Sequence, residues 1–137
     1  MVTDEVGVES AQTLAQTITA HLERWSDRTG IKAETWALPT TDVEPHITRS
    51  VLTTVREALA NVERHSGAET VCVAVTVGQS GLRMTISDDG MGSDKPVRGP
   101  GIDLMRTAFA SVGGHLDVNF VPGGGVTVTG VIPFRRR

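Results

Sequence analysis

The sequence has little of several features that mark whole classes of protein. Its 137 residues include one cysteine, no tyrosine and only 4% aromatic residues. The single cysteine, Cys72, excludes an internal disulfide, and with four scattered histidines it gives no zinc-ligand spacing, which favours a reducing, cytoplasmic compartment. The longest apolar run, at 71–77, is far shorter than the roughly 20 residues of a membrane helix, and no signal segment is visible. Direct insertion into a membrane is therefore not expected.

An excess of positive charge is also missing. The 13 Lys and Arg residues against 16 Asp and Glu give a formal net charge of −3. No overall positive field draws the chain to nucleic acid, which is not expected as a partner. The length suits one domain, which we place at residues 9–134 between a flexible arm at 1–8 and a basic tail at 135–137. Glycine is abundant instead, with 15 residues, most of them in the second half.

Apolar residues recur at helical spacing in three segments. The first predicted helix covers 9–29, with Ser10 available as its N-cap. The second, longer helix covers 47–67, and Pro45 fits its first turn. The third covers 102–112 and follows a loop that is rich in Gly, Asp and Pro.

Alternating patterns predict five strands. One lies at 31–38, two form a hairpin over 71–87, and two more form a hairpin over 116–132. Because four strands belong to hairpins and each helix has one apolar face, we expect an α+β fold. It is a two-layer sandwich, with three helices on one face of a mixed, mostly antiparallel five-stranded sheet.

The second helix carries an unusual polar stripe. Arg49, Arg56 and Glu63 lie opposite its apolar arc, as ordinary solvent-facing charges do. Glu57 and Asn61, spaced i,i+4, share a face that borders the apolar arc. This pair is either a solvated helix flank with a local hydrogen bond or a carboxylate and an amide that suit magnesium, which takes few protein oxygens.

The hairpin ends in a second polar cluster, Asp88-Asp89-Gly90-Met91-Gly92. It is either a polar turn or a rigid carboxylate that accepts a hydrogen bond from an exocyclic amine such as that of adenine, beside glycines that admit a flat ring. The run Gly99-Pro100-Gly101 then leads into the third helix, whose first-turn amides favour an anion such as phosphate. No Rossmann fingerprint and no P-loop motif is present.

These segments, in this order, resemble the boxes of a known family. The run Arg56-Glu57-Ala58-Leu59-Ala60-Asn61-Val62-Glu63-Arg64-His65-Ser66 is similar to the N box of two-component sensor histidine kinases of the NarL-type branch. The Asp88 to Gly92 run resembles their first glycine box, and Gly99-Pro100-Gly101-Ile102 the second. The resemblance extends from about Leu14 to Phe134 and implies a catalytic, ATP-binding domain with the GHKL (Bergerat) fold.

The resemblance implies roles for the N box. Asn61 would coordinate the Mg²⁺ that bridges the phosphates of ATP, and Glu57 would be the catalytic acidic residue, whose carboxylate polarises the attacking nucleophile or a magnesium-bound water. Arg64 would reach a phosphate, and His65 would pack on the nucleotide.

The glycine boxes have implied roles as well. Asp88 would accept a hydrogen bond from the adenine amino group, above a floor shaped by Gly90 and Gly92. Gly99 and Gly101 would direct backbone amides at the phosphates, with Ile102 in the same box, and residues 91–98 would form a short ATP lid.

The sequence departs from the family pattern in two places. Where the last strand commonly starts with Gly-Thr, this chain has Gly125-Val126, so the threonine contact with adenine is open, although Thr127 is adjacent. No phosphoacceptor sequence surrounds any of the four histidines, which are His21, His46, His65 and His115. The expected partners are therefore a histidine-containing dimerisation domain of the same kinase and a response regulator.

The leading hypothesis is the ATP-binding half of a histidine kinase, which transfers the γ-phosphoryl group to a histidine on a separate domain. Two alternatives stay open: a stand-alone GHKL serine kinase of the anti-sigma-factor type, and a domain that only binds nucleotide or a partner. The presence of Glu57, Asn61 and Asp88 argues against the last.

Overall fold

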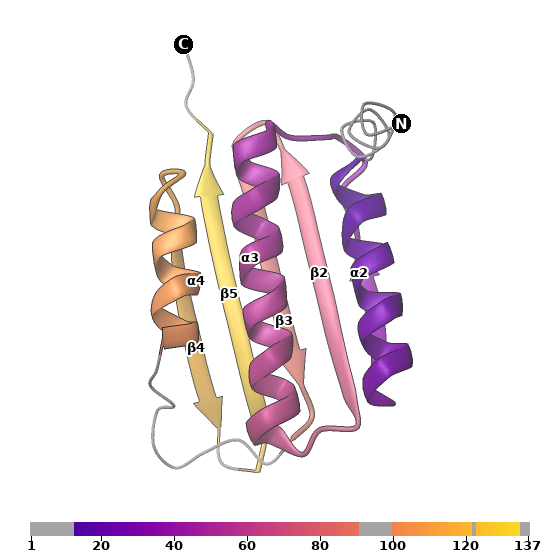
Figure 1. Ribbon diagram of the computed structural model, residues 1–137. Helices are drawn as coiled ribbons and strands as arrows, with labels where there is room; N and C mark the ends of the chain where they lie inside the picture. Colours follow the sequence, from indigo (N-terminus) through magenta and orange to yellow (C-terminus); the bar gives the residue numbers. More distant parts are fainter. Residues whose placement is uncertain (1–12, 91–99, 122, 135–137) are drawn as a thin grey trace.

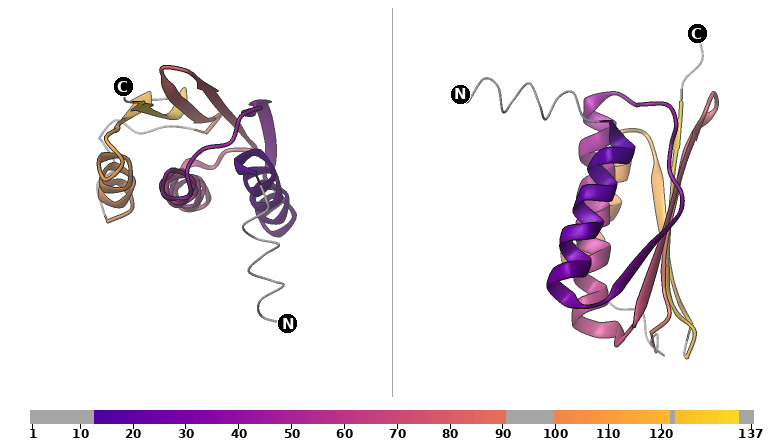
Figure 2. Two further views of the ribbon diagram at one scale, coloured as in Figure 1. Left: turned by 90° about the horizontal axis from the view of Figure 1, so that it is seen from above. Right: turned by 90° about the vertical axis from the view of Figure 1, so that its right-hand side faces the viewer.

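The computed structural model describes residues 13–90, 100–121 and 123–134. Five strands form one sheet in the order β1-β2-β3-β5-β4, and three helices lie side by side on one of its faces (Figure 1, Figure 2). The predicted α+β sandwich is confirmed. The elements follow in the order α2 (Leu14–Thr29), β1 (Lys32–Ala37), α3 (Pro45–Asn61), the π-helical turn η1 (Val62–Ser66), β2 (Thr70–Gly78), β3 (Gly81–Asp88), α4 (Pro100–Ala110), β4 (His115–Val121) and β5 (Gly125–Pro133).

The sheet is mixed, as predicted, because β1 adds a parallel pair to the antiparallel pairs of the two hairpins. Strand β1 pairs with β2 in parallel, whereas the β2–β3, β3–β5 and β4–β5 pairs are antiparallel. Gly78 pairs with Gly81 across the first hairpin, so its turn contains only two residues. The second hairpin closes where Val121 pairs with Gly125. Strand β3 and helix α3 both end at the same end of the sandwich, and α4 and β5 begin there (Figure 1).

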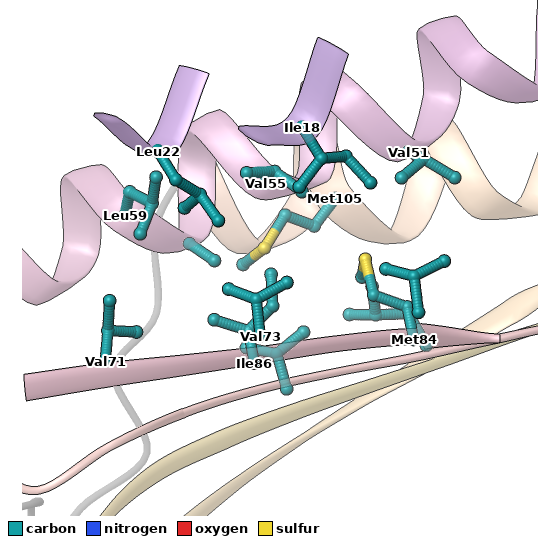
Figure 3. Packing of buried hydrophobic residues seen from close by; sticks show 14 of the residues in the cluster. Ile18, Leu22, Val51, Val55, Leu59, Val71, Val73, Met84, Ile86 and Met105 are labelled. Atoms are coloured by element: carbon teal, nitrogen blue, oxygen red, sulfur yellow. The ribbon is translucent and has the colours of Figure 1, made fainter. Parts of the chain in front are cut away.

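The core lies between the helices and the sheet. Alternate residues of β2 and β3 point at the helices, and α2, α3 and α4 each contribute an apolar stripe to the same layer (Figure 3). Ile18 on α2, Val55 on α3 and Val73 on β2 are fully buried. Burial of a side chain of this size stabilises the fold by about 1.5–3 kcal/mol. The opposite face of the sheet has no helix over it in the part of the chain that the structure describes (Figure 2).

The first helix begins later than the periodicity predicts. It starts at Leu14, and Thr13 forms a capping box with Gln16. Ser10, the predicted N-cap, lies outside the described residues. The predicted stop at Gly30 is confirmed, since this glycine adopts the left-handed conformation that ends many helices.

Two further helix ends differ from prediction at the candidate site. Pro45 does begin α3, but α-helical geometry ends at Asn61, and the chain continues as a π-helical turn to a left-handed Gly67. Helix α4 begins at Pro100 rather than at Ile102, so Gly101 belongs to its first turn. The predicted arm at 1–8 and tail at 135–137 lie outside the described residues. No described helix combines the length and apolar character that crossing a bilayer requires.

Candidate functional site

The polar pair of α3 faces the first turn of α4. A Cβ atom built on Gly101 would lie 3.1 Å from Glu57 Oε1 and 3.7 Å from Asn61 Oδ1. Both polar side chains are half-buried, and Met105 and Ile102 anchor α4 in the core beside them. The i,i+4 pair and the second glycine box, far apart in sequence, are thus brought together. Because Gly101 has no side chain, Glu57 can lie against the start of α4 without moving aside.

Arg64 extends this polar group. Its Nη2 donates a hydrogen bond to Asn61 Oδ1 over 3.3 Å, and the guanidinium group is otherwise exposed. Arg64 therefore places a positive charge beside the amide oxygen predicted to bind metal. His65 lies in η1, but its side chain is outside the described part of the chain, as are Gly92, Gly99 and the predicted lid at 91–98.

Glu63 is exposed, as predicted, but it also has partners that the sequence did not indicate. The Glu63 carboxylate accepts hydrogen bonds from Trp25 Nε1 at 2.7 Å and from both terminal nitrogens of Arg28 at 2.8 and 3.1 Å. The Arg28 bonds are the main cause that lowers the pKa of Glu63. Arg49 and Arg56 are exposed, as predicted.

Asp88, the last residue of β3, lies on the helix-facing side of the sheet and is 9% exposed. Its Oδ1 accepts a hydrogen bond from the backbone N–H of Gly90 over 2.8 Å, which aligns the carboxylate with the strand end. Burial raises the pKa of Asp88, and the backbone N–H groups of Gly90 and Val126 oppose that shift. Gly125 packs directly on Asp88, at a positive φ of 83°.

Asp89 has a structural role that its sequence context did not predict. Its Oδ1 accepts hydrogen bonds from the backbone N–H groups of Glu69 and Thr70, at 2.9 and 3.0 Å. These bonds lower the pKa of Asp89 and fix the segment that connects η1 to β2. The signal was present as a second acid next to Asp88, but its partners come from a different part of the chain.

Thr127 does not replace the threonine that is missing at position 126. Its hydroxyl lies 3.1 Å from that of Ser87, and both residues lie on the face of the sheet away from the helices. By strand alternation, Val126 is on the same side as the buried Val128. An apolar side chain therefore occupies the position next to Asp88 on the helix-facing side.

The described parts of all three boxes lie at one end of the sandwich: the end of α3, the start of α4 and the junction of β3 with β5 (Figure 1). Among the described residues, no group of three or more His, Cys, Asp or Glu side chains could enclose a metal. Magnesium in phosphate sites needs only one or two protein oxygens, because water and phosphates supply the rest. The Glu57 carboxylate and the Asn61 amide oxygen face the N-terminus of α4 at Gly101. These groups fit a magnesium–phosphate group chemically.

No family model matches this sequence. It is, however, similar to sensor histidine kinases of bacteria. It shares 32% identity over 127 residues with MctS of Rhizobium johnstonii, covering 85% of this chain and 27% of that protein. It shares 28% identity over 123 residues with LiaS of Bacillus subtilis, covering 88% of this chain and 34% of LiaS. The chain thus spans about a quarter to a third of the length of these relatives.

Solved structures give the same result for the fold. The histidine kinase domain of the blue-light activated histidine kinase of Erythrobacter litoralis EL346 superposes with a TM-score of 0.73 at 25% identity, covering 88% of this chain and 61% of that one. Histidine kinase AdeS of Acinetobacter baumannii superposes with a TM-score of 0.67 at 16% identity, covering 90% of this chain and 64% of that one. With the relatives above, these matches identify the chain as a member of the sensor histidine kinase family, corresponding to its catalytic domain.

Proposed function

We propose that this domain binds Mg-ATP and donates the γ-phosphoryl group to a histidine on a separate dimerisation domain, in the NarL-type branch of the family. From there the phosphoryl group would pass to a response regulator, on the cytoplasmic side. The observation that carries the proposal is the approach of Gly101 to Glu57 and Asn61, which joins a helix N-terminus to a carboxylate–amide pair. The order of the boxes and the similarity to sensor histidine kinases support it.

The residues at the end of α3 would serve the phosphates. Asn61 Oδ1 would hold Mg²⁺, which supplies charge neutralisation at the phosphates when bound. Arg64 would then turn from Asn61 toward a phosphate, and Gly101 would offer its backbone N–H at the start of α4. Glu57 would polarise the incoming nucleophile or a water molecule. Phosphoryl transfer depends mainly on such positioning and charge stabilisation.

Asp88 would read the adenine ring. Its carboxylate is buried and held by Gly90, so one acceptor is aimed without loss of side-chain entropy on binding. The neighbouring Val126 would give the ring an apolar contact in place of the family's threonine.

Calorimetry with ADP and with ATP, each with MgCl₂ and with EDTA, tests the binding proposal. We expect magnesium-dependent binding by the unmodified domain. Asp88→Asn keeps the shape and one acceptor oxygen but removes the charge, so affinity should fall by about tenfold or more. Asp117→Asn, an exposed acid on β4, is the matched control and should leave affinity unchanged. An unchanged affinity in Asp88→Asn would exclude the assigned adenine contact.

The acceptor requires a separate test. A dimerisation domain from a NarL-type kinase is added in trans with Mg-ATP, and the phosphorylated product is treated with acid and with base. Phosphohistidine is lost in acid and survives in base, whereas phosphoserine behaves in the opposite way. An acid-stable, base-labile product would favour the serine kinase alternative.

A further inference from the structure

The contact between α2 and η1 lies beside the proposed metal-binding amide. Trp25 and Arg28, on the last turns of α2, both bond to Glu63, which is two residues after Asn61. Both helices end at the same end of the sandwich (Figure 1). We name Trp25, Arg28 and Glu63 the α2–η1 clamp.

The geometry of the clamp is specific. Arg28 binds the Glu63 carboxylate through both terminal nitrogens, and Trp25 Nε1 donates to Oε1 over 2.7 Å. The Trp25 side chain is 4% exposed, so its indole is fixed by the core. Glu63 is therefore attached to a rigid point of the fold, although its own residue lies at the surface.

The clamped segment has unusual backbone geometry. The α-helix changes to a π-helical turn directly after Asn61, and π-helical segments occur frequently at functional sites. On the other side of Glu63, Arg64 bonds to Asn61 Oδ1. Asn61 and Arg64 thus lie on either side of Glu63, the residue through which α2 bonds to this turn.

We infer that Glu63 is a positioning residue, which uses Trp25 and Arg28 to hold Asn61 and Arg64 in place for the magnesium-bound phosphates. This inference rests on the proposed function and adds to it the helix α2, none of whose residues is among the proposed nucleotide contacts. It requires that loss of the clamp weakens the magnesium-dependent part of nucleotide binding and spares the adenine contact at Asp88.

Arg28→Ala is the first test variant. The Arg28 side chain is 63% exposed, so its removal leaves the core intact. ADP affinity is measured with MgCl₂ and with EDTA. We expect the gain in affinity from magnesium to fall by about three- to tenfold, with little change in EDTA. Arg24→Ala, an exposed arginine one turn earlier on α2, is the control and should match the unmodified domain in both conditions.

Glu63→Gln tests the other side of the clamp, with Glu23→Gln on α2 as its control. It should reproduce Arg28→Ala, and Arg28→Lys should restore part of the magnesium gain by returning one charged donor. An unchanged magnesium gain in both Arg28→Ala and Glu63→Gln would overturn the inference. Equal losses with and without magnesium would also overturn it, because they would indicate a general structural role. If the unmodified domain binds no ADP in either condition, the proposed function itself fails.

Trp25 offers a second readout that does not depend on affinity. The chain has two tryptophans, so Trp36→Phe leaves Trp25 as the single indole, and Trp36 is a 73% exposed residue on edge strand β1. In this background, MgCl₂ added to the ADP-bound protein should shift the NMR signal of the Trp25 indole N–H. The shift should disappear when Glu63→Gln is added. A signal that magnesium leaves unmoved in the Trp36→Phe protein would contradict coupling through the clamp.

Discussion

Two regions meet where β3 ends. One is the candidate adenine site around Asp88, and the other is the segment at the start of β2, which Asp89 holds by hydrogen bonds. On the helix-facing side, Asp88 is buried, accepts a hydrogen bond from the Gly90 backbone, and has a raised pKa. At the neighbouring position, Asp89 accepts two backbone N–H groups from the start of β2 and has a lowered pKa. The charged form of Asp88 is therefore disfavoured in the folded protein, whereas the charged form of Asp89 is stabilised there.

The difference separates function from stability at adjacent positions. A buried carboxylate whose ionisation is disfavoured by its surroundings is available to a ligand, at a cost to the folded state. A carboxylate that satisfies two backbone donors stabilises the charged form and the segment it holds. Ionisation of the two aspartates therefore has opposite effects on the stability of the fold. Variants in each region test this difference.

The largest effect is expected from Gly125→Ala, which disrupts the packing of β5 against Asp88. A Cβ atom at this position would overlap the backbone oxygen of Asp88, and φ is 83°, a conformation that alanine adopts poorly. We expect a loss of about 3 kcal/mol in the free energy of unfolding. Urea denaturation measures it, with Gly123→Ala as the control: φ is 73° there too, but the site is open space. Equal losses in both variants would mean that backbone conformation alone, and not packing on Asp88, requires glycine at 125.

Asp89→Ala should have the next largest effect, and on stability only. It leaves the backbone N–H groups of Glu69 and Thr70 without their acceptor, so we expect a clearly lower thermal midpoint with unchanged ADP affinity. Because both bonds go to the same oxygen, Asp89→Asn keeps an acceptor and should lose less. A drop in ADP affinity measured below the thermal midpoint would show that the two regions are not separate.

Gly101→Ala should have a smaller effect, limited to ligand binding. The new methyl group would lie 3.1 Å from Glu57 Oε1, which is the end of a flexible side chain that can move aside. Stability should therefore change little, whereas the affinity for Mg-ADP should fall a few-fold because the carboxylate leaves its position against α4. Calorimetry and thermal denaturation of the same sample separate the two quantities. Unchanged Mg-ADP affinity would contradict the proposed role of this contact.

The sequence predicted the fold and the placement of some candidate site residues, because both depend on local periodicity. The i,i+4 spacing places Glu57 and Asn61 on one face regardless of tertiary structure, and alternation places Asp88 on the buried side of its strand. The glycine run at 99–101 predicted backbone amides at the start of the third helix, and the structure places Gly101 in the first turn of α4. Its close approach to Glu57 was not predicted. Alternation could also have shown that Thr127 faces away from Asp88, since adjacent strand residues point to opposite faces.

The missed features all depend on partners distant in sequence. Glu63 looks solvent-facing on its own helix, and only the packing of α2 brings Trp25 and Arg28 to it. Asp89 looks like a turn residue until the start of β2 supplies two donors. The π-helical turn after Asn61 follows an unbroken apolar pattern, so the change of hydrogen bonding has no signal in the sequence.

The smallest expected effect is a difference in pH dependence, and it compares the two aspartates most directly. Both have an ordinary pKa of 3.8. The pKa of Asp88 is raised in the folded state, so the stability of the unmodified domain relative to Asp88→Asn should fall as pH rises from 3.8 through that raised pKa. The pKa of Asp89 is lowered, so stability relative to Asp89→Asn is fully present above 3.8 and should be lost as pH falls through the lowered pKa. Urea denaturation of the three proteins across acidic pH measures both differences, and slopes of the same sign would refute the contrast between the two regions.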